Sequence, residues 1–205
     1  MKKLSIYGLI IIISIFLSCA SSPFQSAPQE KASAVKKIPD IPEHIMGQGN
    51  AGAGDLALFL MQNNPQANVV FVRALAHFYI EEAAAEGVNH DIAFAQMCLE
   101  TGFLRYGGDV KPEQYNFCGL GATGGVPGLS FPDPRTGVRA QIQHLKAYAS
   151  EEPLKGENVD PRFRYVRRGS SPTIEGLAGT WAADRQYPVK IYSILERLYD
   201  FAFSA

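Results

Sequence analysis

One glutamate, Glu100, stands where a carboxyl group could act as an acid catalyst. It follows a run of apolar, helix-forming residues and comes directly before a glycine-rich segment. Partial loss of water raises the pKa of a carboxyl group, and such a group can give its proton to a glycosidic oxygen near neutral pH. By composition alone, a solvated glutamate at a helix end with aromatic residues in the core is the alternative. Several aromatic side chains could offer stacking faces for sugar rings, namely Tyr115, Phe117, Tyr165, Trp181 and Tyr187.

The elements that must position Glu100 are helical. Apolar residues in two adjacent i, i+4 rows predict an amphipathic helix from Ala67 to Glu86 that ends near Gly87. Asn89 can cap a second helix, in which Gln96 lies one turn before Glu100 on the same face. This shared face makes Gln96 a candidate sugar contact on geometric grounds.

A second, irregular part of the fold follows this helix. Nine of the 19 glycines and four of the 13 prolines lie between Gly102 and Gly137, a density that favours loops or a short hairpin and excludes a long helix. Apolar stripes at 138–149 and 191–198 predict two more helices, and Pro188 suits the first turn of the second. We expect a mainly α domain with a small Gly-rich β-hairpin or loop lobe.

Charge and motifs argue against several other classes of protein. The formal net charge of −1 offers no attraction for a nucleic acid. The GxGxxG pattern at 119–124 follows no apolar strand, and Pro127 prevents a helix after it, so it does not predict a dinucleotide site. The four histidines and three cysteines show no metal-ligand spacing, and no GxSxG nucleophile motif occurs. We expect no cofactor and no bound metal.

The N-terminal residues are typical of an export signal. Two lysines precede an apolar run that is too short to cross a bilayer, which predicts a signal peptide at 1–18. The sequence Phe-Leu-Ser-Cys ending at Cys19 resembles a bacterial lipobox and makes Cys19 the expected lipidation site; an ordinary signal peptide with an incidental cysteine is the alternative. Residues 19–46 are rich in Pro, Ser and Lys and predict a disordered tether before a folded domain at 47–205. We expect an exported lipoprotein, anchored to a membrane by its N-terminal lipid.

Three motifs carry a more specific signal. The first, Ala-Gln-Met-Cys-Leu-Glu-Thr-Gly, contains Glu100, and the second, Asn-Phe-Cys-Gly-Leu, begins at Asn116. The third, Trp-Ala-Ala-Asp, begins at Trp181 and is followed by Tyr187 and Lys190. In this order they resemble the three motifs of the bacterial glucosaminidases (endo-β-N-acetylglucosaminidases, glycoside hydrolase family 73). The resemblance spans nearly the whole expected domain.

The resemblance implies a lysozyme-like α+β fold with a glycan cleft between the two lobes. It also implies that the protein binds peptidoglycan glycan strands and cleaves the β-1,4 bond after N-acetylglucosamine. We expect a monomer because the sequence shows no heptad seam and no long exposed apolar stretch. Glu100 would be the general acid. The resemblance makes Asn116, Phe117 and Tyr187 substrate-binding residues. We add Gln96 on geometric grounds, and Tyr115 and Trp181 as aromatic faces for the sugar rings.

The second lobe departs from the family pattern, because its glycine-rich segment carries no acid where relatives often place another carboxylate. Asp133 is the first candidate for that carboxylate, ahead of Asp109, Glu113 and Asp184. A mechanism in which the substrate's own acetamido oxygen stabilises the positive charge is the alternative. Two rival functions share the same residues: a lytic transglycosylase, and a peptidoglycan-binding lipoprotein without catalytic activity.

Two cysteines remain if Cys19 carries lipid. Cys98 and Cys118 could form a disulfide in an exported protein and so join the catalytic helix to the second lobe. Two buried, reduced thiols are the alternative. Cys98 lies two residues before Glu100 and therefore points away from it around the helix, so a catalytic thiol is not expected.

Overall fold

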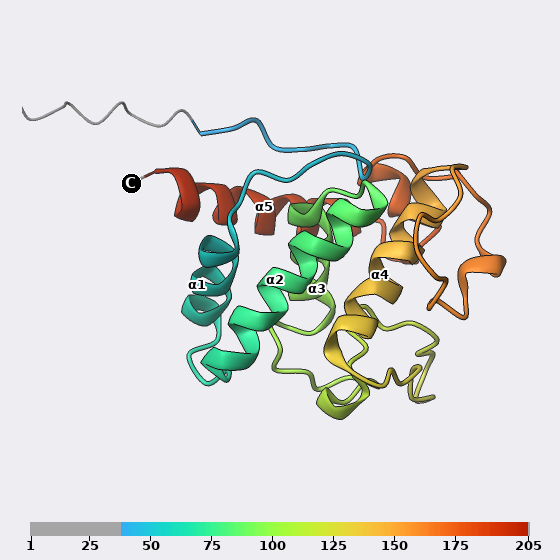
Figure 1. The fold of residues 1–205 in the computed structure, drawn as a ribbon, viewed down its shortest axis with the longest axis horizontal. Coiled ribbons are helices and arrows are strands. Elements are labelled where there is room, and N and C mark those ends of the chain that lie inside the picture. The colour runs from blue at the N-terminus through green and yellow to red at the C-terminus, as the bar shows by residue number, and fades with distance from the viewer. Residues whose placement is uncertain (1–37, 205) are drawn as a thin grey trace, which may run out of the picture. The chain divides into compact units, whose positions relative to one another are not determined.

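The computed structural model describes residues 38–204, in which the regular elements are all helical (Figure 1). The predicted signal peptide, Cys19 and the first part of the predicted tether lie outside these residues. No helix among the described residues is both long and apolar enough to cross a membrane. Short 3-10 helices are Pro112–Gln114, Phe163–Tyr165 and Glu175–Leu177; the α-helices are α1 (Ala53–Asn63), α2 (Val69–Glu86), α3 (His90–Glu100), α4 (Pro134–Ala149) and α5 (Tyr187–Phe203).

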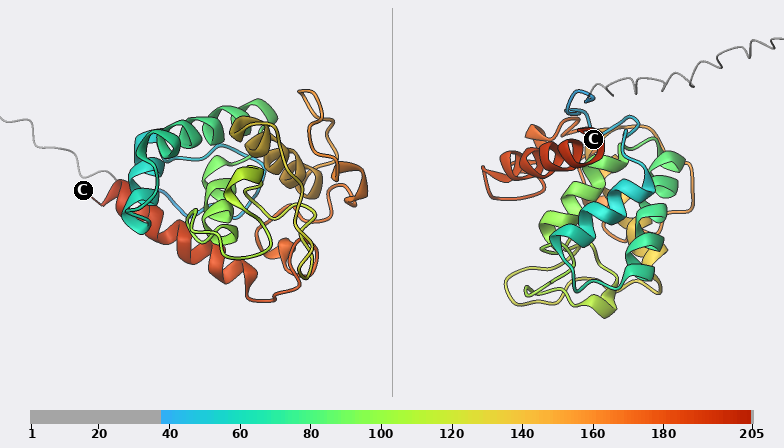
Figure 2. Two further views of the ribbon diagram at one scale, coloured as in Figure 1. Left: turned by 90° about the horizontal axis from the view of Figure 1, so that it is seen from below. Right: turned by 90° about the vertical axis from the view of Figure 1, so that its left-hand side faces the viewer.

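Helix α3 occupies the centre of the helical lobe. Its residues from His90 to Cys98 are all buried, and it contacts α2, α4 and α5. Figure 2 shows α3 enclosed by these helices from two further directions. Burial on every side explains why its sequence is apolar around the whole helix rather than along one stripe. Only the C-terminal end of α3, where Glu100 lies, reaches the surface.

The predicted helix boundaries near α3 are confirmed. The Asn68 side chain accepts a hydrogen bond from Phe71 N and caps α2. The helix therefore begins at Val69, two residues after the predicted start at Ala67. Gly87 ends α2 with a positive φ of 78°, which a residue without a Cβ adopts easily. The Asn89 side chain accepts from the backbone N–H groups of Asp91 and Ile92 and caps α3.

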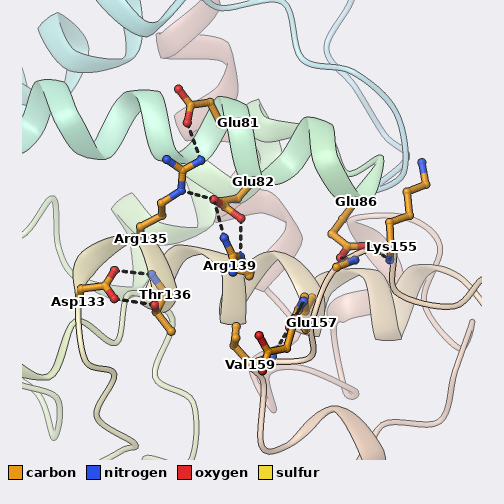
Figure 3. Close-up of polar contacts among 12 residues, drawn as sticks. Glu81, Glu82, Glu86, Asp133, Arg135, Thr136, Arg139, Lys155, Glu157 and Val159 are labelled. Atoms are coloured by element: carbon orange, nitrogen blue, oxygen red, sulfur yellow. Dashed lines mark hydrogen bonds and ion pairs between the residues drawn. The ribbon is translucent and has the colours of Figure 1, made fainter.

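Ion pairs join α2 to α4 (Figure 3). Glu82 is buried and accepts hydrogen bonds from Arg135 and Arg139, at 2.5 and 2.7 Å between nitrogen and oxygen. One turn later, Glu86 accepts from the Lys146 Nζ at 2.9 Å. Burial raises the pKa of Glu86, but hydrogen bonds from the Lys155 and Gly156 backbones and from Lys146 outweigh it and leave the pKa lowered. Both carboxylates are therefore ionised and hold α4 in place.

Replacing Lys146 with Met is expected to lower the free energy of unfolding by about 3 to 5 kcal/mol, because it leaves the Glu86 charge buried without its cation. Urea unfolding followed by circular dichroism measures the change. The same substitution at Lys190, whose partner Asp184 is on the surface, is the matched control and should change stability little. An equal loss of unfolding free energy in the two variants would show that the buried ion pair of Lys146 stabilises the fold no more than the exposed one of Lys190.

The second lobe, at 101–133, is built from loops. The expected hairpin is reduced to one isolated bridge between Thr123 and Val126, and residues 38–204 contain no β-strand. The buried Asn116 side chain replaces strand pairing: its Nδ2 donates to the carbonyls of Leu120 and Leu129, and its Oδ1 accepts from Leu120 N. A small apolar cluster completes the lobe and consists of Cys118, Leu120, Phe131 and Ala140.

The folded domain begins earlier than residue 47. Ile45 is completely buried, its N–H donates to Pro172 O, and its carbonyl accepts from Asn89 N. Glu43 O accepts from Ile174 N in the same stretch. The predicted tether is thus wrong for residues 38–46, which cover the helical lobe as an extended segment. The sequence pattern concealed this because so short a segment shows no period.

Candidate active site

Two donors from separate segments converge on the Glu100 carboxyl group. The Tyr187 hydroxyl, at the start of α5, donates to Glu100 Oε1 at 2.6 Å. The Trp181 indole N–H donates to the same oxygen at 3.2 Å. Oε2 lies toward Gly119 of the second lobe, where a Cβ would come within 4.0 Å of it. One oxygen is therefore held by donors, and the other faces the second lobe.

The surroundings of Glu100 favour its protonated form. Although the residue reaches the surface at the end of α3, the walls around the carboxyl shield it from water, and this burial raises its pKa. The hydrogen bonds from Tyr187 and Trp181 lower the pKa but do not cancel the effect of burial. A carboxyl group in this environment retains a proton at a higher pH than a solvated glutamate does.

A pocket of about 150 Å³ separates Glu100 from the second lobe. Asn116 and Gly119 of that lobe line it, as does the carboxylate-bearing residue Asp109. Tyr106 lines both this pocket and a larger one of about 730 Å³. Phe71 and Tyr115 are among the other residues that line the larger pocket. The smaller pocket is the one lined by Glu100, the carboxyl group whose pKa is raised.

Gln96 is not a sugar contact, contrary to the prediction. Its side chain is completely buried, and its Nε2 donates to the Tyr187 hydroxyl at 3.0 Å. Gln141 Nε2 donates to Gln96 Oε1 at 2.8 Å, and the Tyr79 hydroxyl donates to Gln141 Oε1 at 2.5 Å. A directed chain of hydrogen bonds thus runs from Tyr79 through Gln141, Gln96 and Tyr187 to Glu100. It fixes the orientation in which Tyr187 donates.

Sequence reasoning missed Tyr79 and Gln141. They lie on α2 and α4, and the residues they bond are 62 and 45 positions away along the chain. Both are completely buried polar side chains, which are placed in a core only with hydrogen-bond partners. The one available signal was a glutamine within the apolar stripe of α4.

The other predicted substrate contacts divide into two groups. Trp181 is half-buried beside the carboxyl, and Tyr115 lines the larger pocket. Asn116 borders the pocket of Glu100, but its side chain is buried and bonded to Leu120 and Leu129, so it holds the loop and does not contact a sugar as predicted. Phe117 is completely buried, with its ring centroid 6.5 Å from that of Phe71, so it offers no face to a sugar and the prediction for it is wrong.

The predicted second carboxylate, Asp133, is occupied elsewhere. It caps α4, where it accepts from the Thr136 N–H at 2.9 Å and the Thr136 hydroxyl at 2.7 Å (Figure 3). The hydrogen bond from the Thr136 backbone, followed by that from its hydroxyl, lowers the pKa of Asp133. Asp133 does not line the pocket of Glu100, whereas Asp109 does.

The possible disulfide is absent. Cys98 and Cys118 are both free and buried, and they belong to two different apolar clusters. Burial raises the pKa of each thiol, so neither is a ready nucleophile. Among residues 38–204, no group of three His, Cys, Asp or Glu side chains could hold a metal ion.

The profile of the glucosaminidase family, described as mannosyl-glycoprotein endo-β-N-acetylglucosaminidase, matches residues 76–200. The chain belongs to this family. The match includes all residues whose side chains reach the Glu100 carboxyl. A protein of Borreliella burgdorferi described as uncharacterised is 43% identical over 173 residues, which is 84% of each chain.

The fold of this glucosaminidase domain also occurs in a solved structure. Autolysin E of S. aureus, crystallised with the muropeptide NAM-L-Ala-D-iGlu, superposes with a TM-score of 0.50 at 14% identity. The alignment covers 80% of this chain and 73% of the autolysin. The expected lysozyme-like architecture, mainly helical with a small second lobe, is thereby confirmed.

Proposed function

We propose that this glucosaminidase domain hydrolyses the β-1,4 bond after N-acetylglucosamine in peptidoglycan strands, with Glu100 as general acid. The observation that carries the proposal is a carboxyl group of raised pKa, held by Tyr187 and Trp181 at the wall of a pocket between two lobes. A binding protein without catalytic activity has no need of such a group. The family membership supports the same class of substrate.

The two oxygens of Glu100 have different roles in this mechanism. Oε1 accepts from Tyr187 and Trp181, so the acidic proton is carried by Oε2, which faces the pocket. Transfer of this proton to the glycosidic oxygen breaks the bond to C1 and leaves an oxocarbenium-like centre. As the proton leaves, negative charge develops on the carboxylate, and the two donors stabilise it.

The second group in the reaction is Asp109, which replaces Asp133 in our proposal because it lines the pocket of Glu100. Its carboxylate would stabilise the positive centre or activate the attacking water. Asp109→Asn is expected to lower the cleavage rate by about 10²-fold. Asp133→Asn is the control, since asparagine also caps helices, and should keep the rate. Little loss in Asp109→Asn would instead favour stabilisation by the substrate's acetamido oxygen.

Tyr187→Phe tests the link between geometry and pH dependence. The variant removes a donor to the charged form of Glu100, so the pKa of Glu100 rises further. An acid catalyst works while protonated, and the fall in rate at high pH should therefore move to higher pH, with a lower maximum. Tyr192→Phe is the control. Tyr192 lies on α5, as Tyr187 does, but its hydroxyl is bonded to Glu175, so its loss should leave the pH profile of the rate unchanged. A profile unchanged in Tyr187→Phe would contradict the role of Tyr187.

Analysis of the new chain ends tests the function itself. Peptidoglycan is incubated with residues 38–205, reduced with borohydride and examined by mass spectrometry. Reduced N-acetylglucosamine ends are expected. Anhydro-muramic ends would assign the protein to the lytic transglycosylases, and binding without new ends would leave a glycan-binding module.

The location we propose is the cell envelope, with the protein exported and anchored through lipid on Cys19. A labelled fatty-acid precursor should enter the full-length chain and fail to enter Cys19→Ala. A lipid anchor followed by the part of the predicted tether that precedes residue 38 would allow a monomeric domain to reach the glycan. Equal labelling of the two chains would contradict the anchor.

A further inference from the structure

A strongly basic segment lies on the surface of the domain after α4. Residues 161–168, the arginine segment, contain four arginines and no acidic residue, in a chain whose net charge is −1. Arg162, Arg164 and Arg167 are exposed, and within the described part of the chain none of them forms an ion pair with a carboxylate. Figure 1 shows this segment at the end of the domain beyond α4. Three guanidinium groups without a carboxylate partner among the described residues are thus exposed on one short segment, two of them against the Tyr165 ring.

The arginine segment is held rigidly at both ends. At its start, the buried Asp160 accepts from Arg162 N at 2.9 Å and pairs with His144 Nδ1 at 2.7 Å. At its end, Arg168 donates to the carbonyls of Ser150 and Glu152. This anchoring limits the backbone entropy that is lost when the exposed arginines bind a ligand; their side chains still lose rotamer freedom.

Side-chain packing connects the segment to the carboxyl of Glu100. The His144 ring, which is bonded to Asp160, lies 5.1 Å from the Trp181 ring between centroids. Trp181 in turn donates to Glu100. A pocket of about 380 Å³ opens at 158–161 beside Arg164. The anchor of the arginine segment is thus linked through His144 to Trp181, the residue that donates to Glu100.

We infer that the arginine segment binds the carboxylates of the peptide stems carried by the glycan, so that this enzyme prefers peptide-substituted strands to bare ones. The inference rests on the proposed function. Guanidinium groups match carboxylates in geometry and charge. The exposed ring of Tyr165, with Arg164 4.8 Å from its centroid, adds an apolar face for the peptide. An anionic membrane is the lesser fit, because only three of the four arginines are exposed, whereas membrane-binding clusters typically use about four to eight basic residues.

Binding to two forms of one polymer tests the inference. Peptidoglycan strands are used intact or after an amidase has removed their stems, and affinity is measured by co-sedimentation with Glu100→Gln as the background. The domain should bind intact strands about three- to tenfold more tightly. The triple variant Arg162→Gln, Arg164→Gln, Arg167→Gln should bind the two equally. Arg73→Gln, which removes one exposed charge from α2, is the control and should keep the preference.

Each other outcome would overturn the inference. Equal binding of the two strands by the parent domain, or a preference that survives in the triple variant, would show that the segment does not recognise stems. Loss of binding to phosphatidylglycerol vesicles in the triple variant, with the preference for intact strands unchanged, would assign the segment to a membrane. Binding is measured without turnover, so failure of the proposed hydrolysis would be seen separately, as an absence of new chain ends.

Discussion

Glu100→Gln is expected to lower the rate of glycan cleavage by about 10²- to 10⁴-fold, the usual contribution of a general acid. The glutamine amide keeps the shape of the side chain, and its oxygen can still accept from Tyr187 and Trp181. Binding to glycan strands should persist because only the transferable proton is lost. Initial rates of release of reducing ends, beside co-sedimentation with the same substrate, measure the two effects separately.

The interpretation of this variant depends on an intact fold. Because Glu100 lies at the end of α3 and is not part of the core, the free energy of unfolding should change little or increase, since a neutral group replaces one that burial disfavours in its charged form. Glu175→Gln, at a carboxylate bonded by Tyr192 outside the pocket, is a matched control that should keep full activity. Substantial cleavage by a folded Glu100→Gln would contradict the assignment.

Gly137→Ala is expected to destabilise the domain strongly, because Gly137 lies where α4 packs against the second lobe. Gly137 lies in α4, and a Cβ there would come 1.8 Å from the carbonyl oxygen of Tyr115. This neighbour is backbone and cannot rotate away. We expect a loss of at least about 3 kcal/mol in the free energy of unfolding, although alanine is intrinsically the better helix former. Asn116 would move with Tyr115, so cleavage should also fall.

Gly54→Ala is the matched control for this prediction. Gly54 lies in α1, and a Cβ there would meet no atom within 4 Å. Alanine at that position should raise the free energy of unfolding by about 0.5 to 1 kcal/mol through the smaller entropy of the unfolded chain. Urea unfolding of the two variants should therefore show changes of opposite sign. A neutral or stabilised Gly137→Ala would show that the contact with Tyr115 is unimportant.

The sequence predicted those parts of the fold that depend on local chemistry. Asn89 and Gly87 mark helix ends through their own side chain and backbone, so reading them needs no knowledge of distant residues. Glu100 and Tyr187 are 87 positions apart in the chain, yet their side chains are hydrogen-bonded. The motif resemblance assigned both residues to the cleft, and no local pattern does so. Hydrophobic periodicity gives the face of a helix, and it does not give the partner on that face.

The errors at Gln96 and Asp133 have different causes. Gln96 was placed correctly one turn before Glu100, but α4 and α5 cover it and convert an expected sugar contact into a buried positioning residue. Asp133 is an acid before a proline-initiated helix, and capping satisfies it there. Reading it as a cap required only the local pattern of aspartate three residues before Thr136.

The measurement that tests the central claim most directly is the pKa of Glu100 itself. Carboxyl ¹³C chemical shifts are followed by NMR as pH is varied, and comparison with Glu100→Gln identifies the resonance of Glu100. We predict that this carboxyl titrates above the ordinary glutamate pKa of about 4.3, and higher still in Tyr187→Phe. A Glu100 that titrates at or below the ordinary value in the intact domain would contradict its role as the acid.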